Sequence, residues 1–335
     1  MGKGICIAGN MIVDIIYPIE GFPNRGQLVH IHDGISRAVG GAVCNVIVDL
    51  AKLDPEMPLY AIGKIGDDGE GDLIMQTLGE HKNINTDNVI REGISAFTAV
   101  MSDRITNERT FFTYLGANGK WDEDNIDWSK VKGDIFHVGY ILLLNALDQD
   151  DPEYGTRMAR LLHHAQQHGL KTSIDVVSEA SDRFTRFVPP AMKYTDYCII
   201  NEVEAQQTTG IILRNEAGEL VTENIPEALH EMKRLGVSTW AVIHCPEGGY
   251  GLDENNEYVA LGSLKLPDGY IKGTVGAGDA FCAGVLYGAE TGRTLAQSID
   301  LGIASAAASL SQPGSTEGLR TEAEVLGLFD EFQRR

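Results

Sequence analysis

The sequence predicts an α/β fold in which a central, mostly parallel sheet lies between layers of helices. Short apolar runs alternate along the chain with longer amphipathic segments, which is typical of β-α-β units. The chain has 335 residues, enough for one large α/β core or for about two smaller domains. Two other stretches alternate polar and apolar residues, and they predict a small second sheet beside the main one.

Six apolar runs have the length and composition of strands that are buried on both faces of a sheet. These runs are residues 4–9, 58–66, 134–139, 171–177, 196–201 and 239–245. Between them, apolar residues recur at helical spacing, and acids, proline and glycine mark helix starts and stops. The clearest helical segments are residues 45–53, 150–169, 225–236, 278–292 and 295–311.

The two alternating stretches lie at about residues 16–36 and 95–115. Their pattern is typical of half-exposed antiparallel strands, with one face packed and the other in solvent. A β-α-β-α portion separates them in sequence, so we expect them to meet in space as a small sheet. Such an addition to an α/β core is expected to serve as a lid.

Composition excludes several classes of protein. Asp and Glu number 48 against 27 Lys and Arg, which gives a formal charge of −21. Because a negative protein surface repels phosphate groups, this charge excludes binding of nucleic acid through phosphate contacts. The five cysteines are widely spaced and form no CxxC pair, as expected for buried thiols in a reducing compartment. No apolar run approaches the length of a membrane span, the run VGYILLL is strand-sized, and the first 20 residues lack signal-peptide features. We therefore expect a soluble, cytoplasmic protein with no membrane partner.

The segment GTVGAGDAFCAGVLYGAETG, residues 273–292, carries the chemistry. Gly276, Ala277 and Gly278 lack bulk, Asp279 follows at once, and a helical pattern begins there. A helix start offers free N–H groups and partial positive charge, so this pattern predicts an anion cradle. Beside it, a carboxylate can take a proton from a hydroxyl that attacks phosphorus. Locally, an acid that merely stabilises a helix start explains Asp279 equally well.

Three segments together resemble the ribokinase (PfkB-type) carbohydrate kinases. Residues 273–284 are similar to the family's C-terminal signature, DTxGAGDxFxxG, and residues 38–53 with 60–74 are similar to its N-terminal signature. NEVEAQQTTG, residues 201–210, resembles its NxxE motif, and all three occur in the family's order. The resemblance implies a ribokinase-like three-layer α/β/α fold with a β-sheet lid, as one kinase domain over residues 1–335.

The resemblance also implies roles for the catalytic and metal-site residues. Asp279 matches the base that deprotonates the acceptor hydroxyl, and Gly276 to Gly278 match the anion hole for the transferred phosphoryl group. Asn201 and Glu204 match the residues of the Mg²⁺ site, to which oxygen ligands or their bound waters are suited. The local alternative for NxxE is a helix cap, in which Asn caps and Glu reaches back.

By the same resemblance, four N-terminal residues bind the sugar: Asp14, Gly40, Gly41 and Asn45. Asp14 would accept hydrogen bonds from two hydroxyls, and Asn45 would donate and accept. Gly40 and Gly41 would leave room for the ring. On local evidence alone, the Asp is an ordinary turn residue and the glycine pair an ordinary loop.

The chain departs from the family pattern in two places that concern the nucleotide and a cation. Gly273 stands where the family usually has Asp, although Thr274 is kept, and Gly318 stands where a side-chain ligand is common. Activation by a monovalent cation such as potassium is therefore left open. The nucleotide-contacting TxGxxG appears as HCPEGG, in which Gly249 fits and His244 replaces Thr. ATP remains the expected donor, with His244, Gly249 and Thr274 as nucleotide-binding residues.

The sequence thus predicts an ATP-dependent kinase acting on a hydroxymethyl group of a small sugar of the ribose, fructose or 2-keto-3-deoxygluconate type. A nucleoside kinase of the same superfamily is an alternative, with a base stacked on Phe111, Phe112 or Tyr114 in the lid. A phosphosugar kinase would need basic residues near the acceptor, and the candidates are Lys64, Arg104 and Arg109. A non-catalytic sugar-binding or regulatory protein is the alternative from another class. Lid sheets of the family often pair between chains, so we expect a homodimer through the lid.

Overall fold

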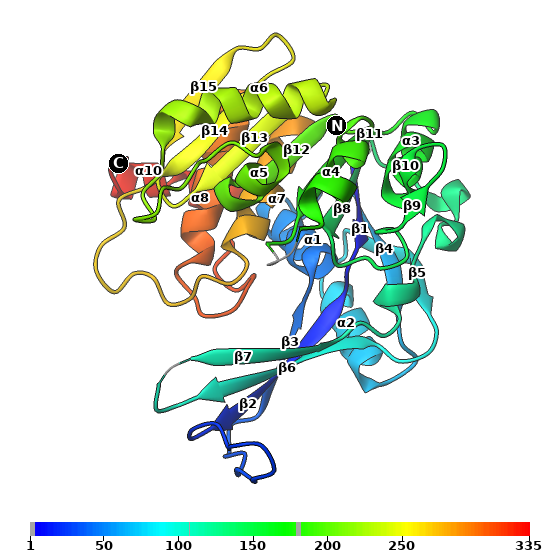
Figure 1. Cartoon of the computed structure of the whole chain (residues 1–335), viewed down its shortest axis with the longest axis vertical. Helices are drawn as coiled ribbons and strands as arrows, with labels where there is room; N and C mark the ends of the chain where they lie inside the picture. Colours follow the sequence, from blue (N-terminus) through cyan, green and yellow to red (C-terminus); the bar gives the residue numbers. More distant parts are fainter. Residues whose placement is uncertain (1–3, 107, 179–181) are drawn as a thin grey trace.

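The computed structural model describes residues 4–106, 108–178 and 182–335, and Figure 1 shows a large sheet between helices with a smaller sheet projecting from one end. Among these residues the large sheet has nine strands. In spatial order they are β15 (Tyr258–Gly262), β14 (Gly248–Leu252), β13 (Trp240–Cys245), β12 (Tyr197–Asn201), β11 (Lys171–Val176), β8 (Ile135–Ile141), β1 (Ile5–Gly9), β4 (Leu59–Ile65) and β5 (Ile84–Arg91). In this spatial order, each strand from β13 through β5 pairs in parallel with the next. At the other edge, β14 pairs antiparallel with β13 and β15 pairs antiparallel with β14.

Helices cover both faces of this sheet. Along β1, Ile5 and Ile7 belong to one buried cluster and Cys6 and Ala8 to another, so the strand packs on both sides. The first cluster includes residues of α1 (Ala42–Leu53), α2 (Gly69–Gly79), α7 (Ala277–Glu290), α8 (Leu295–Ser309), α9 (Glu322–Leu326) and α10 (Leu328–Glu331). The second includes residues of α3 (Arg157–Gln167), α4 (Phe184–Met192), α5 (Glu202–Thr209) and α6 (Ile225–Leu235). The predicted three-layer α/β/α fold is confirmed.

All six predicted main-sheet strands form within two residues of their expected bounds. The sequence did not predict the two edge strands β5 and β15, nor β14, which lies next to β15. The sequence of β5, INTDNVIR, contains no continuous apolar run. In β14, GGYGL contains three glycines, a composition that predicts a turn rather than a strand.

One predicted helix begins later than expected. Residues 150–156 form a small hairpin, β9 (Asp150–Asp151) and β10 (Gly155–Thr156), and α3 begins only at Arg157. The Asp151 carboxylate accepts hydrogen bonds from two backbone N–H groups of the turn, those of Glu153 and Tyr154, which favours the turn over a helix. Short 3₁₀ helices cover Asn118–Lys120, Glu123–Asn125, Trp128–Lys130 and Thr222–Asn224. In the described part of the chain, no helix is long and apolar enough to cross a membrane.

The smaller sheet has the strand order β3 (Ser36–Gly40), β2 (Ile12–Ile19), β6 (Ala96–Asp103) and β7 (Arg109–Tyr114) and projects below the main sheet in Figure 1. The two segments meet as expected, but β2 and β6 pair in parallel, whereas β3 and β7 pair antiparallel to their neighbours. The first segment also differs from its expected bounds, because β2 starts at Ile12 and residues 20–35 lie in no strand. Gly21 and Gly26 have φ values of 82° and 83° there, which interrupt extended structure.

Candidate active site

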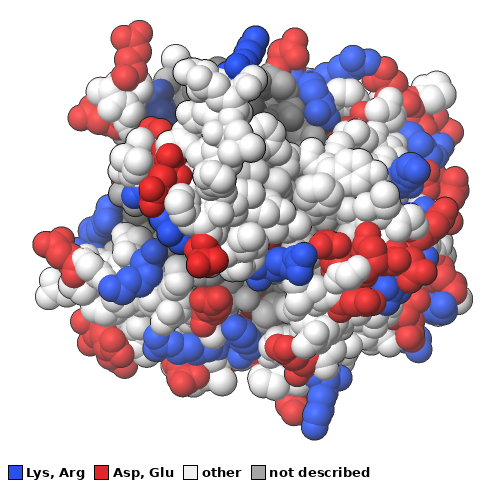
Figure 2. Space-filling view, turned by 90° about the horizontal axis from the view of Figure 1, so that it is seen from below, with Lys and Arg blue, Asp and Glu red and all other residues white. Residues whose placement is uncertain are grey.

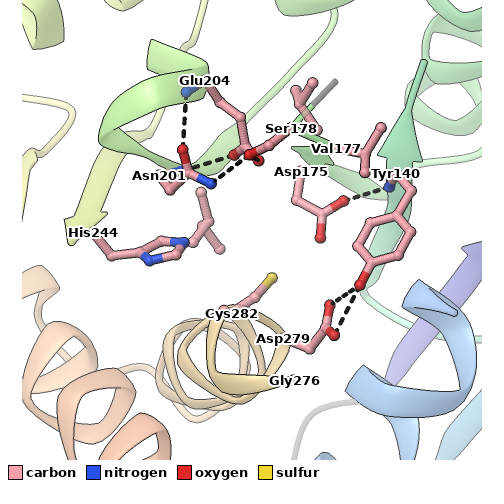
Figure 3. Close-up of a pocket in the computed structure, with 13 residues that line it drawn as sticks. Tyr140, Asp175, Val177, Ser178, Asn201, Glu204, His244, Gly276, Asp279 and Cys282 are labelled. Carbon is pink, nitrogen blue, oxygen red and sulfur yellow. Dashed lines mark hydrogen bonds between the residues drawn. The ribbon is translucent and has the colours of Figure 1, made fainter. Parts of the chain in front are cut away.

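A cavity of about 280 Å³ lies between the carboxyl ends of the central strands and the start of α7. Figure 3 shows side chains from β8, β11, β12 and α7 converging on it. Its lining residues are Tyr140, Asp175, Val176, Val177, Ser178, Ile199, Asn201, Glu204, His244, Gly276, Gly278, Asp279 and Cys282. In open α/β sheets this edge is where ligands bind.

Asp279 lies in the first turn of α7, and 5% of it is exposed. The Asn45 side-chain amide donates a hydrogen bond to Oδ2 at 2.8 Å. The Tyr140 hydroxyl donates to both carboxylate oxygens, at 3.0 and 2.9 Å (Figure 3). Burial raises the pKa of Asp279 to about 6, although the bonds from Asn45 and Tyr140 lower it. Near neutral pH the side chain is therefore a carboxylate that can accept a proton.

Gly276 caps α7 in the left-handed region, with φ 80°. A Cβ at this position would lie 2.4 Å from the carbonyl oxygen of Ser315, so the loop 310–318 leaves no room for a side chain. The first N–H groups of α7 have no partners within the helix and are the donors available to an anion. The predicted segment Gly276 to Gly278 thus forms the helix start, and both glycines line the cavity.

Tyr140 and Asp175 are site residues that the sequence did not identify. Tyr140 has φ 63°, unusual for a non-glycine residue, and its N–H donates to Asp175 Oδ1 at 2.5 Å. This unusual backbone conformation directs the phenol toward Asp279. A signal for Asp175 was present, since an acid stands inside the apolar run 171–177 at the end of a parallel strand.

Asn201 and Glu204 form the helix cap that was the alternative for NxxE, and they also line the cavity. Asn201 Oδ1 accepts from the Glu204 N–H, and Glu204 Oε2 accepts from the Asn201 N–H, both at 2.9 Å. The Ser178 hydroxyl donates to Glu204 Oε1 at 2.8 Å. Burial raises the pKa of Glu204 to about 7, with help from the charges of Glu202 and Asp279. Glu204 is thus a buried carboxyl group whose surroundings disfavour its negative charge.

The four predicted sugar-site residues divide into two groups. Asn45 lies on α1, where it donates to Asp279 and its Oδ1 accepts from the Ser315 hydroxyl at 2.9 Å. Asp14, Gly40 and Gly41 lie where the lid joins the main sheet and do not line the cavity. An added Cβ at Gly40 would lie 3.3 Å from Asp14 Oδ2. Burial raises the pKa of Asp14, whereas a hydrogen bond with Thr98 and the charge of Arg109 lower it.

Asn10, next to the first strand, is a further polar group that the sequence did not identify. It is buried, and its Oδ1 has no hydrogen-bond partner in the described structure. A Cβ at Gly41, where φ is 87°, would lie 2.4 Å from that oxygen. Gly41 is therefore required by the close approach to Asn10, and the free oxygen beside it is an acceptor close to the predicted sugar-binding residues.

A second, more apolar cavity of about 420 Å³ adjoins the first. Thr274, Ala277 and Gly278 line it together with apolar residues such as Leu264, Leu266, Ile271, Phe281 and Ile303. His244 lines both cavities and stacks on Phe281, with ring centroids 4.7 Å apart. Burial lowers the pKa of His244 to about 4, so the imidazole is neutral and offers one N–H donor.

Gly249, the third predicted nucleotide-binding residue, lines neither cavity. It lies opposite His244 in the β13–β14 pair. A Cβ there would come within 2.6 Å of Ile299 Cγ2 and 3.1 Å of the Phe281 ring. The structure therefore explains this glycine by the packing of α7 and α8 on the sheet.

The fold and the sequence are similar to those of known sugar kinases. Residues 3–322 match the family described as "pfkB family carbohydrate kinase". The chain is 29% identical over 264 residues to an "uncharacterized sugar kinase" of Archaeoglobus fulgidus, covering 77% of this chain and 93% of the relative. It is 24% identical to a 5-dehydro-2-deoxygluconokinase of Bacillus velezensis, and the match covers 88% of this chain and 86% of the relative. The structure of Arabidopsis thaliana ribokinase complexed with ribose and ATP superposes with a TM-score of 0.80 at 20% identity. The superposition covers 98% of this chain and 99% of the ribokinase chain.

Proposed function

Since the chain belongs to the PfkB family of carbohydrate kinases, we propose that it transfers the γ-phosphoryl group of ATP to a hydroxymethyl group of a small sugar. The family makes the protein a phosphotransferase acting on a sugar hydroxyl. The observation that carries the proposal is the Asp279 carboxylate, which is buried in the first turn of α7 and lines the first cavity, next to Gly278, which lines both cavities. This position supports a role as proton acceptor, because a helix start next to it is suited to bind an anion.

In the proposed reaction, the acceptor hydroxyl oxygen forms a bond to the γ-phosphorus while the bond from that phosphorus to the β,γ-bridging oxygen breaks. Asp279 takes the hydroxyl proton, and ADP leaves with the electron pair of the broken bond. N–H groups at the start of α7 stabilise the charge on the transferred phosphoryl group. Asn45 and Tyr140 hold the carboxylate in position through the hydrogen bonds described above.

The residues present fit a magnesium ion that travels with the nucleotide. Glu204 is a buried carboxylate whose pKa is raised to about 7 by burial, and a nearby cation would favour its charged form. Its oxygens and those of Asn201 already have protein partners, so they would hold the ion through its bound waters, which Mg²⁺ retains readily. When bound, the ion would neutralise phosphate charge in a chain that carries −21.

The apolar cavity suits the nucleoside part of ATP, and the neutral His244 at its boundary can donate one hydrogen bond to a phosphate oxygen. For the sugar, Asp14 and Asn10 offer acceptors and Asn45 a donor at the base of the lid. The candidate acceptors are ribose, fructose, 2-keto-3-deoxygluconate and acids of the 5-dehydro-2-deoxygluconate type. The last class is included because one relative is named 5-dehydro-2-deoxygluconokinase.

The experiment that tests the function is a coupled assay of ADP release. Purified protein is given ATP and Mg²⁺ with each of these sugars, and with adenosine and inosine in parallel. We expect turnover with one sugar class that exceeds the blank at least a hundredfold. Turnover with nucleosides alone would favour a nucleoside kinase that uses the exposed Phe111 and Phe112. ATP binding without turnover on any acceptor would favour the non-catalytic alternative.

Tyr140→Phe is expected to shift the pH dependence of turnover. The phenol hydroxyl lowers the pKa of Asp279, so its removal raises that pKa above its value of about 6. Because the base works only when ionised, activity is lost as pH falls through this pKa. The midpoint of the acidic limb should therefore move up by roughly half to one pH unit, the equivalent of one hydrogen bond.

The measurement is kcat/KM from pH 4.5 to 8.5. Tyr287→Phe is the matched control, since the Tyr287 hydroxyl also donates to a carboxylate, that of Glu322, at 2.9 Å but away from the cavity. The control should keep the wild-type midpoint. An unchanged midpoint in Tyr140→Phe would show that the phenol does not govern the ionisation of Asp279.

We also propose a homodimer that forms through the lid. Figure 2 views the molecule from the lid end and shows a broad area without charged side chains. All six residues of β7, an edge strand, are exposed. Large apolar side chains of the lid region that are at least 45% exposed are Phe22, Leu28, Ile31, Ile35, Ile105, Phe111, Phe112 and Tyr114. An apolar edge of this kind is a template for pairing with a second copy.

Sedimentation velocity at micromolar concentration should therefore give a dimer, and Phe111→Asp should shift it to a monomer. Ile212→Asp is the control, because Ile212 is similarly exposed, at 58% against 62%, but lies outside the lid. A wild-type protein that sediments only as a monomer would contradict this assembly.

A further inference from the structure

Three side chains of metal-ligating types converge beside the catalytic cavity. They are His137 of β8, Asp175 of β11 and Cys282 of α7, and one ligand atom of each lies within 4.8 Å of the others. Cys282 Sγ is 3.9 Å from His137 Nε2, which is 4.0 Å from Asp175 Oδ2. Exposure is 0% for His137, 7% for Asp175 and 2% for Cys282. Among the described residues this is the one such group of three or more.

Partners outside the cluster orient two of the three side chains. The Ser173 hydroxyl lies 3.0 Å from His137 Nδ1, so the other ring nitrogen faces Cys282. The N–H of Tyr140 donates to Asp175 Oδ1, which leaves Oδ2 on the side of His137. A second polar partner that fixes the ring or carboxylate is the usual arrangement of histidine and carboxylate ligands in metal sites.

The charge balance of the cluster also fits a divalent ion. Burial raises the pKa of Asp175 and of Cys282 well above their usual ranges, and it lowers the pKa of His137 to about 3. Burial therefore disfavours the charged form of each of the three side chains. An ion of charge 2+ bound to the Asp175 carboxylate and the Cys282 thiolate leaves the filled cluster with no net charge, so no unpaired charge is buried.

We propose that His137, Asp175 and Cys282 form a binding site for a thiophilic divalent cation of the zinc class, separate from the magnesium of the nucleotide. Thiolate and imidazole select such ions over Mg²⁺. In a tetrahedral zinc site the ligand atoms are roughly 3.3–3.6 Å apart. The pairs at 3.9 and 4.0 Å must therefore close by about 0.5 Å, and the third pair, which lies within 4.8 Å, by at most about 1.5 Å. Asp175 and Cys282 line the cavity (Figure 3), so the ion can enter there and take a fourth ligand from solvent.

The test is a titration of chelator-treated full-length protein with Co²⁺, in excess Mg²⁺ and without nucleotide. We expect one equivalent to bind with a sulfur-to-cobalt charge-transfer band in the near ultraviolet, and Zn²⁺ to abolish the band by competition. Cys282→Ser should lack the band, and His137→Gln should weaken binding at least tenfold. Cys44→Ser is the matched control, since Cys44 is an equally buried thiol outside the cluster.

X-ray absorption of the wild-type protein loaded with one equivalent of Zn²⁺ gives a result that depends on no variant. One sulfur neighbour with nitrogen and oxygen neighbours is expected. No charge-transfer band, a band that persists in Cys282→Ser, or a zinc shell without sulfur would each overturn the site. The three side chains would then only pack together in the core, with their hydrogen bonds to Ser173 and Tyr140.

Discussion

Replacing Asp279 with Asn is expected to lower kcat by about 10²–10⁴ while the protein stays folded. The amide has nearly the same shape, and its oxygen can still accept the hydrogen bond that Asn45 donates. It cannot take the proton of the acceptor hydroxyl. KM for the nucleotide should change little, because the N–H groups of the α7 start remain in place. The measurement is steady-state ADP release with the best acceptor of the panel.

This variant also separates the two explanations of an acid at a helix start. If Asp279 only complements the helix dipole, its loss costs about 0.3–1 kcal/mol of stability and little activity. Asp72→Asn is the control for that effect, because Asp72 is in the first turn of α2, exposed and away from the cavity. Equal and small effects on kcat in both variants would refute the role of Asp279 as base.

The sequence allowed the main sheet and the α7 start to be predicted because they depend on local composition. Buried parallel strands need continuous apolar runs, and a helix that begins at GAGD needs small residues at its cap, as at Gly276. The late start of α3 could not be predicted in this way. It depends on the Asp151 carboxylate, which bonds to the turn that follows and so favours a hairpin over a helix.

Among the site residues, the sequence-based approach found those in motifs and missed those that tertiary packing brings together. Tyr140 contacts Asp279 across 139 positions of sequence and does so from a left-handed backbone conformation that no local pattern indicates. Gly249 shows the opposite case. It fits a nucleotide motif, yet the structure explains it by the approach of Ile299 and Phe281. Glycines that permit packing and glycines that permit ligand approach look alike in a sequence.

Gly276→Ala is expected to reduce kcat by about 10²–10³, the cost of losing one well-placed donor to the transferred group. The new methyl group would lie 2.4 Å from the Ser315 carbonyl oxygen and 2.7 Å from its Cα, so the α7 start or the loop must move. The Ser315 hydroxyl bonds to Asn45, which bonds to Asp279. A shift of the loop would thus reach Asp279, the proposed base, as well as the N–H groups at the α7 start that we propose bind the phosphoryl group.

Gly292→Ala distinguishes this effect from simple backbone strain. Gly292 follows the other end of α7 with φ 72°, close to the 80° of Gly276, but a Cβ there meets nothing within 4 Å. Both variants should lose about 1–2 kcal/mol of stability from a left-handed alanine. Only Gly276→Ala should lose turnover, measured at a temperature where both remain folded by circular dichroism. If both variants keep the same kcat, the contact between the new methyl group and Ser315 has no effect on turnover. The α7 start would then not act on the transferred phosphoryl group.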